Sequence, residues 1–114
     1  MSSHSKPPPI GALRRRLRLE ALDLAADGAG GLTGTWTQVA EIWGAVQPRT
    51  GLETFSGDGI EARVTHDVWI RPRSDVLAGH RLRLLDGRLL NIRAVLTPDV
   101  FLNRSRLICE QHSP

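Results

Sequence analysis

Cysteine is nearly absent from this sequence of 114 residues. Cys109 is the only one, which excludes an intramolecular disulfide and a metal site built from several cysteines. It lies in a short apolar run, where we expect it to act as a small buried hydrophobic residue. Long apolar runs are absent too, and none approaches the roughly 20 residues of a membrane helix. The N-terminus lacks the apolar segment of a signal peptide, so we expect a cytoplasmic protein with no membrane partner.

Motifs for catalysis and cofactor binding are missing as well. The four histidines are scattered along the chain without the spacing of a zinc site. His66 alternates into an apolar pattern, which favours a hydrogen-bonded core histidine over a metal ligand. The glycines of residues 28–34 do not follow the phosphate-binding pattern. We therefore expect no enzyme activity, no cofactor, no metal and no small-molecule substrate.

Lysine is scarce and arginine abundant, since Lys6 is the only lysine among 15 basic residues. The formal net charge of +3 is compatible with nucleic acid nearby but does not demonstrate binding. The chain has the length of one domain, and 40% apolar with 24% charged residues is typical of a globular protein. We expect one hydrophobic core.

The first part of the chain predicts an arm, a strand and a loop. Residues 1–9 are polar and end in three prolines, which is typical of a flexible arm. Leu17 and Leu19 alternate with Arg16 and Arg18, which predicts a half-buried strand with arginine on its outer face. Residues 27–34 contain four glycines and predict a loop.

Residues 35–48, TWTQVAEIWGAVQP, support two interpretations. Apolar residues recur at helical spacing, Trp36, Trp43 and Val46 among them. Against a helix, the segment is rich in β-branched and aromatic residues and contains Gly44 in its last turn. The pattern alone does not decide between helix and strand.

The second half of the chain reads as strands and turns. Residues 49–61 contain three glycines and predict a long loop with at most one helical turn. Residues 62–70 alternate between apolar and polar positions, which predicts a strand. Two apolar runs joined at Asp86 and Gly87 predict a hairpin, and residues 105–111 a last strand. We predict a mainly β domain over residues 10–111, with five or six antiparallel strands, long loops, at most a short helix and a tail at 112–114.

The arginines allow two interpretations. They form two groups on predicted strands: Arg14, Arg16 and Arg18 in the first, and Arg81, Arg83, Arg88 and Arg93 in the second. Such stripes on a small barrel could bind phosphates, as in oligonucleotide-binding barrels. Those barrels usually add stacking aromatic residues, whereas this chain has no tyrosine and two phenylalanines. The alternative is that these arginines cover a strand face and pair with nearby carboxylates.

Several stretches together resemble the head-tail joining family of tailed bacteriophages, also called head-tail adaptor, head completion or stopper proteins. The order and spacing of these stretches carry the resemblance over residues 10 to 110. The chain departs from the family at residues 54–61, where relatives often have a longer and more helical insertion. The matching stretches are GALRRRL (11–17), WTQVAEIWGAVQP (36–48), Gly51-x-Glu53, THDVWIR (65–71), DGRLLNIR (86–93) and LICE (107–110).

The resemblance implies a small β-barrel that assembles as a homo-oligomeric ring, on the order of six or twelve subunits, in the neck of a phage or gene transfer agent particle. Such a ring joins head to tail and helps retain or gate the packaged double-stranded DNA in its channel. A portal or adaptor ring would lie above it and tail terminator or tail tube proteins below. The protein would be cytoplasmic during assembly and part of the virion afterwards. Among the neck layers the stopper is favoured over the adaptor and the tail-completion protein, and the family has no catalytic residues.

Candidate functional positions follow from this resemblance. Tryptophan is enriched at interface hot spots, although two of the three tryptophans could simply pack in the monomer core. If residues 35–48 form a strand, Trp36 and Trp43 would lie on opposite faces, one filling the barrel and the other meeting a neighbour. We expect a subunit interface at Trp36, Trp43, Trp69, Arg71 and Glu53, a channel loop at Gly51, Leu52, Phe55, Gly57 and Asp58, and DNA-facing or inter-subunit arginines at Arg14, Arg16, Arg81 and Arg83.

Overall fold

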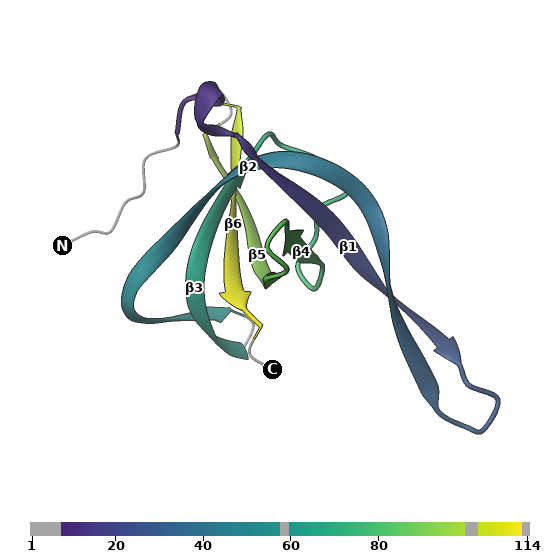
Figure 1. Cartoon of the computed structure of the whole chain (residues 1–114). Helices are drawn as coiled ribbons and strands as arrows, with labels where there is room; N and C mark the ends of the chain where they lie inside the picture. The colour runs from purple at the N-terminus through teal and green to yellow at the C-terminus, as the bar shows by residue number, and fades with distance from the viewer. Residues whose placement is uncertain (1–7, 58–59, 100–102, 113–114) are drawn as a thin grey trace.

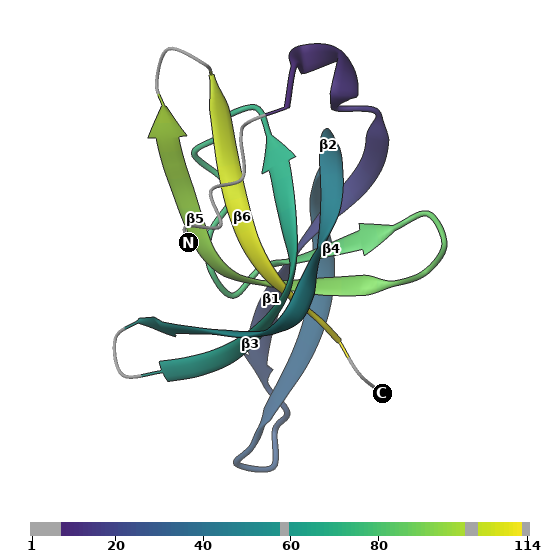
Figure 2. The same cartoon turned by 90° about the vertical axis from the view of Figure 1, so that its left-hand side faces the viewer.

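The computed structural model describes residues 8–57, 60–99 and 103–112. Within them a short 3-10 helix, η1 (Ile10–Ala12), is followed by strands β1 (Arg15–Ala26), β2 (Leu32–Gly57), β3 (Ile60–Ile70), β4 (Arg81–Leu84), β5 (Leu89–Asp99) and β6 (Arg104–Gln111). All strand pairs are antiparallel, and they close into a barrel in the order β1-β2-β3-β6-β5-β4 (Figures 1 and 2). The predicted mainly β fold is confirmed, and none of the described helical residues forms a segment able to cross a membrane.

The core of the barrel is made by the inward positions of the strands. Alternation predicted this face correctly for β1, β3 and the β4–β5 hairpin, because every second side chain of a strand points to the same side. Gly87 has a φ of 93°, as the tight turn of that hairpin requires. The buried cluster contains Leu17, Leu19, Ile42, Val68, Ile70, Val76, Leu82, Leu84, Leu90, Ile92, Leu107 and Cys109.

Cys109 and His66 behave as the sequence predicted. Cys109 is fully buried, and burial raises the pKa of its thiol far above the ordinary range, so the thiol stays protonated and inert. His66 is buried beside it in the sheet and shares a 2.8 Å hydrogen bond between its Nδ1 and Thr65 Oγ1. Burial, with the nearby charge of Arg88, lowers the pKa of His66, so the imidazole is a neutral core group.

Residues 35–48 are strand, which resolves the choice that their sequence left open. Two loop predictions were wrong. The turn after β1 spans only residues 27–31, because β2 already begins at Leu32. Residues 49–57 continue β2 and pair with β3, Glu53 with Val64 and Phe55 with Ala62, after a register shift beyond Pro48. The shift accommodates the proline, which has no backbone N–H to donate, so the sheet overrides the local turn signals.

A bulge in β2 changes which way its tryptophans face. Leu19 pairs with Ala40 and the next residue of β1, Glu20, pairs with Gln38, so Val39 is an extra residue. The extra residue shifts the alternation of β2 by one. Trp36 lies opposite Leu22 and Trp43 opposite Arg16, which are both outward positions of β1. The prediction of opposite faces was therefore wrong, and both tryptophans lie on the outer face of the barrel.

The prolines at the start of the described chain are bonded to the rest of the molecule. The carbonyl of Pro8 accepts a hydrogen bond of 3.0 Å from Arg104 Nε, and the carbonyl of Pro9 accepts one of 2.9 Å from the Ala12 N–H. These two residues, which the sequence assigned to a flexible arm, are thus held against η1 and β6.

Candidate assembly surfaces

The outer face of β1 and β4 carries an ion-pair cluster centred on Glu20. This carboxylate accepts hydrogen bonds from Arg81 Nε at 2.6 Å and from Arg83 Nε at 3.3 Å. Burial alone would raise the pKa of Glu20, but the hydrogen bonds from the two arginines outweigh it and hold the pKa below its ordinary value of 4.5. Arg81 also stacks on Trp36, with its guanidinium carbon 4.1 Å from the ring centroid. Arg81 and Arg83, two of the candidate DNA-facing or inter-subunit arginines, are therefore engaged within the chain.

The Glu20 cluster predicts an acid-sensitive stability. The unfolded chain takes up a proton at Glu20 near pH 4.5, whereas the folded chain does so only at lower pH. The contribution of Glu20 is therefore present above pH 4.5 and is lost as the pH falls through the lowered pKa. We expect Glu20→Gln to cost about 1.5–3 kcal/mol at pH 7 and to flatten the loss of stability below pH 4.5, as measured by urea unfolding between pH 3 and pH 7.

Glu110→Gln provides the control for this measurement. Glu110 meets Arg93 at the surface, at 2.8 Å, and a pair exposed to water contributes little. Its acid unfolding should match that of the unmodified chain. An unchanged acid limb in Glu20→Gln would show that the cluster does not stabilise the fold.

The other predicted arginines of β1 also make local contacts. Arg16 lies over Trp43, 4.9 Å from the ring centroid, while the indole remains 52% exposed. Arg14 precedes β1 and donates from its Nε to the carbonyl of Gly11 at 2.8 Å. These contacts favour the interpretation in which arginine covers a strand face over the one in which a bare stripe awaits phosphate.

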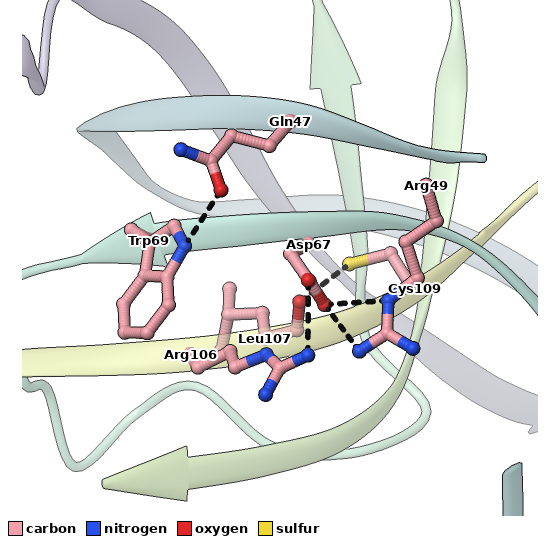
Figure 3. A network of polar contacts seen from close by, with 7 residues as sticks. All are labelled: Gln47, Arg49, Asp67, Trp69, Arg106, Leu107 and Cys109. Atoms are coloured by element: carbon pink, nitrogen blue, oxygen red, sulfur yellow. Dashed lines mark hydrogen bonds and ion pairs between the residues drawn. The ribbon is translucent and has the colours of Figure 1, made fainter. Parts of the chain in front are cut away.

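Trp69 lies outside the barrel lumen but is not on the surface. It is fully buried against Leu13 and Ala45, and its Nε1 donates to Gln47 Oε1 at 3.1 Å (Figure 3). The segment that follows η1 covers it. The expectation that Trp69 contacts a neighbouring subunit is wrong for this position, because its side chain offers no accessible area. It packs within the monomer, as the alternative allowed.

A buried carboxylate, that of Asp67, lies in β3 beside Trp69 and was not predicted from the sequence pattern. Asp67 is 2% exposed, and its two oxygens accept from Arg49 Nη2 at 2.9 Å and from Arg106 Nη2 at 3.0 Å (Figure 3). This contact ties β2, β3 and β6 together on their outer side. The sequence does contain a signal for this ion pair, which is an acidic residue inside an otherwise apolar strand. An aspartate in such a position is rarely buried unless it is paired, so a cationic partner could have been expected.

The remaining predicted residues fall in different places. Arg71 is exposed after β3 and lines an open hollow of about 420 Å³ with Leu13, Ile42, Trp43, Ile70 and Pro72. The channel positions Gly51, Leu52, Phe55 and Gly57, and the interface candidate Glu53, lie on the last part of β2, with side chains outside the described part of the structure; Asp58 lies outside the described residues.

The β1–β2 hairpin forms an arm that the sequence pattern did not predict. Beyond the bulge, the β1–β2 hairpin leaves the barrel as a two-stranded ribbon (Figure 1). It exposes large apolar side chains, with Leu22 43%, Leu24 61% and Leu32 70% accessible. A single hairpin is marginally stable in water, and exposed apolar area of this kind marks a contact surface. The leucines of β1 were a signal for this arm, because Leu22 and Leu24 continue the strand beyond the leucines that the barrel core holds.

The fold is a small antiparallel barrel with an exposed apolar hairpin. In the part of the chain that the structure describes, no cluster of three or more histidine, cysteine, aspartate or glutamate side chains could hold a metal. Residues 8–111 match the family model of phage head completion proteins, and the chain therefore belongs to this family. This is a family of structural phage proteins and not of enzymes, so the family suggested by the sequence motifs is confirmed.

Individual relatives agree with this assignment. The chain is 28% identical over 104 residues to the head completion protein gp7 of Enterobacteria phage HK97. The matched segment covers 88% of this chain and 93% of that protein. The solution structure of protein SF1141 from Shigella flexneri 2a superposes with a TM-score of 0.67 at 29% identity, covering 91% of this chain and 96% of the other. A chain from the virion of a native gene transfer agent particle shares the fold, with a TM-score of 0.66 at 23% identity and coverage of 90% and 97%.

Proposed function

We propose that this protein forms a ring in the neck of a phage-like particle, between the portal or adaptor ring and the tail, and helps retain the packaged DNA. The observation that carries the proposal is the family match over residues 8–111, which includes every described strand. The exposed apolar arm adds support, because a solitary molecule gains nothing from it. Within the neck, the stopper layer is the position we favour.

The end of the β2–β3 hairpin is the element that we propose for the channel. Its strands extend to Gly57 and Ile60, and it leaves the barrel in a different direction from the arm (Figure 1). A molecule with two divergent hairpins can meet its neighbours with one and reach the ring axis with the other. In this proposal four arginines mainly stabilise the subunit surface through contacts within the chain, and contact with DNA is their lesser role. They are Arg14, Arg16, Arg81 and Arg83.

Deletion of the gene tests this function. If the protein joins head to tail and helps retain DNA, a strain that lacks it should produce separate tails and tailless heads that lose packaged DNA, and supplying the gene in trans should restore tailed particles. Negative-stain microscopy of the purified particles distinguishes these outcomes. Normal numbers of tailed particles from the deletion strain would refute the proposal.

The alternative of an autonomous nucleic-acid-binding barrel is less well supported. Arg81 and Arg83 share the carboxylate of Glu20, and Arg16 stacks on an indole, so the stripes present less free charge than the sequence suggested. Phosphate contacts make affinity fall steeply with salt. We expect weak DNA binding by the isolated chain; tight binding with a steep salt dependence would favour the alternative.

A further inference from the structure

One face of the β1–β2 arm is apolar along its whole length. The pairs on this face are Leu22 with Trp36, Leu24 with Gly34, and Ala26 with Leu32. Gly34 leaves room for the leucines, since a Cβ there would lie 3.0 Å from Leu22 Cδ1 and 3.4 Å from Leu24 Cδ2. The arm's other face carries Ala21, Asp23, Ala25, Thr33, Thr35 and Thr37.

The arm is also the acidic part of a basic chain. No lysine or arginine occurs between Arg18 and Arg49, whereas Asp23 and Asp27 lie on the arm. At the tip, Asp27 Oδ1 accepts from the N–H groups of Ala29 at 2.8 Å and Gly31 at 3.0 Å, which lowers the pKa of this carboxyl and keeps it charged. The arm therefore suits a partner that presents an apolar surface, with a cation near the tip at Asp27.

The chain itself carries such a surface at its other end. The hollow beside η1 is lined by Leu13, Ile42, Trp43, Ile70 and Pro72, together with the charged residues Glu41, Arg71 and Arg73. Arg73 is paired with Asp75 at 2.8 Å, which leaves Arg71 as the cation that the hollow presents to an acidic partner. Trp43, half exposed in the isolated chain, forms part of its wall. The hollow therefore matches the arm in apolar character, and its Arg71 could meet the charged carboxylate of Asp27 at the arm tip.

The arm cannot reach the hollow of its own molecule. Leu32 at the arm tip and Trp43 at the hollow lie on the same strand, and the residues between them span roughly 35 Å at about 3.3 Å per residue. The arm and η1 lie at opposite ends of the molecule (Figure 1). A contact between these surfaces therefore joins two copies, and because the two surfaces differ it is a head-to-tail contact that can close into a ring.

We propose that the apolar face of the arm packs into the hollow of the next copy, with Leu24 and Leu32 against Trp43 and Pro72. Asp27 then lies near Arg71 of that copy. This inference deepens the proposed function, on which it rests, by naming the surfaces through which the ring is built. It also assigns a use to Trp43 and Arg71 as interface residues.

Cysteine cross-linking tests the contact. The chain that carries both Leu24→Cys and Pro72→Cys should give a ladder of covalent multimers with a short bis-maleimide, since each copy offers both halves of the contact. The native Cys109 is buried and does not compete. The reaction is run on purified particles and on the isolated chain at high concentration. Adding Leu32→Ser should lower the multimer yield about threefold or more, because it removes apolar area from the contact.

The matched control is Thr35→Cys with Pro72→Cys. Thr35 lies on the polar face of the same arm and should give little multimer. A ladder in either sample that depends on Leu24 supports the inference. No ladder in both samples, or an equal ladder from the Thr35 pair, overturns it. Immunoblotting the same particles tests the proposed function separately, because particles without the chain refute the neck role whatever the isolated chain does.

Discussion

Replacing Trp69 by alanine is expected to lower the free energy of unfolding by about 3–5 kcal/mol, as is usual when a large buried aromatic side chain is removed. Trp69 is fully buried, packs against Leu13 and Ala45, and donates a hydrogen bond to Gln47. Truncation would leave a cavity and an unpaired glutamine oxygen under the N-terminal segment. Small domains have only about 5–15 kcal/mol of stability in total, so the loss is severe.

Guanidinium unfolding followed by circular dichroism measures this effect without relying on tryptophan fluorescence. Trp43→Ala is the matched control, since Trp43 is 52% exposed and stacks on Arg16 at the outer face. The Trp43→Ala substitution should lower the free energy of unfolding by well under half as much as Trp69→Ala. Its main effect should be on assembly. Equal losses of stability in the two variants would show that Trp69 is not the buried anchor described here.

Asp67→Asn is expected to cost about 3 kcal/mol, the lower end of the range for breaking a buried ion pair. The substitution keeps the shape of the side chain but removes the charge that Arg49 and Arg106 share, and leaves two guanidinium groups side by side. Because this contact ties β2 and β6 to β3, local opening should rise as well as global unfolding.

Urea unfolding and amide hydrogen exchange of β3 and β6 would measure both effects. Asp75→Asn is the control, because the Arg73–Asp75 pair, although as short as 2.8 Å, lies at the surface and should change stability by less than about 1 kcal/mol. If Asp67→Asn were no more destabilising than Asp75→Asn, the buried pair would not stabilise the barrel.

The strands that the sequence predicted best are those whose alternation matches a single buried face. β1 alternates Leu17 and Leu19 with arginine, β3 places Val64, Val68 and Ile70 on one face, and the Asp86-Gly87 turn fixes the register of β4 against β5. In these segments, local pattern and tertiary packing agree. The motifs that indicated the head completion family lie in β2 and β6 as well as in these elements.

Other features depend on contacts that the local sequence does not contain. The extra residue Val39 is visible only from the pairing of β2 with β1, and it reverses the face of Trp36 relative to Trp43. Gly44 appeared to be a helix breaker, but its role is close packing, since a Cβ there would lie 2.8 Å from Leu17 Cδ1 and 3.0 Å from the Trp69 carbonyl oxygen. Residues 49–57 have the local sequence of a loop, and they form a strand because they pair with β3.

Localisation of the chain in purified tailed particles tests the central claim, that this barrel is a neck component, most directly. Antibody against an epitope tag on the C-terminus, detected by immunogold microscopy, should label the junction between head and tail. Particles that lack a tail because the gene is deleted should carry no label. Tailed particles without label, or with label on the capsid shell or the distal tail tip, would contradict the account.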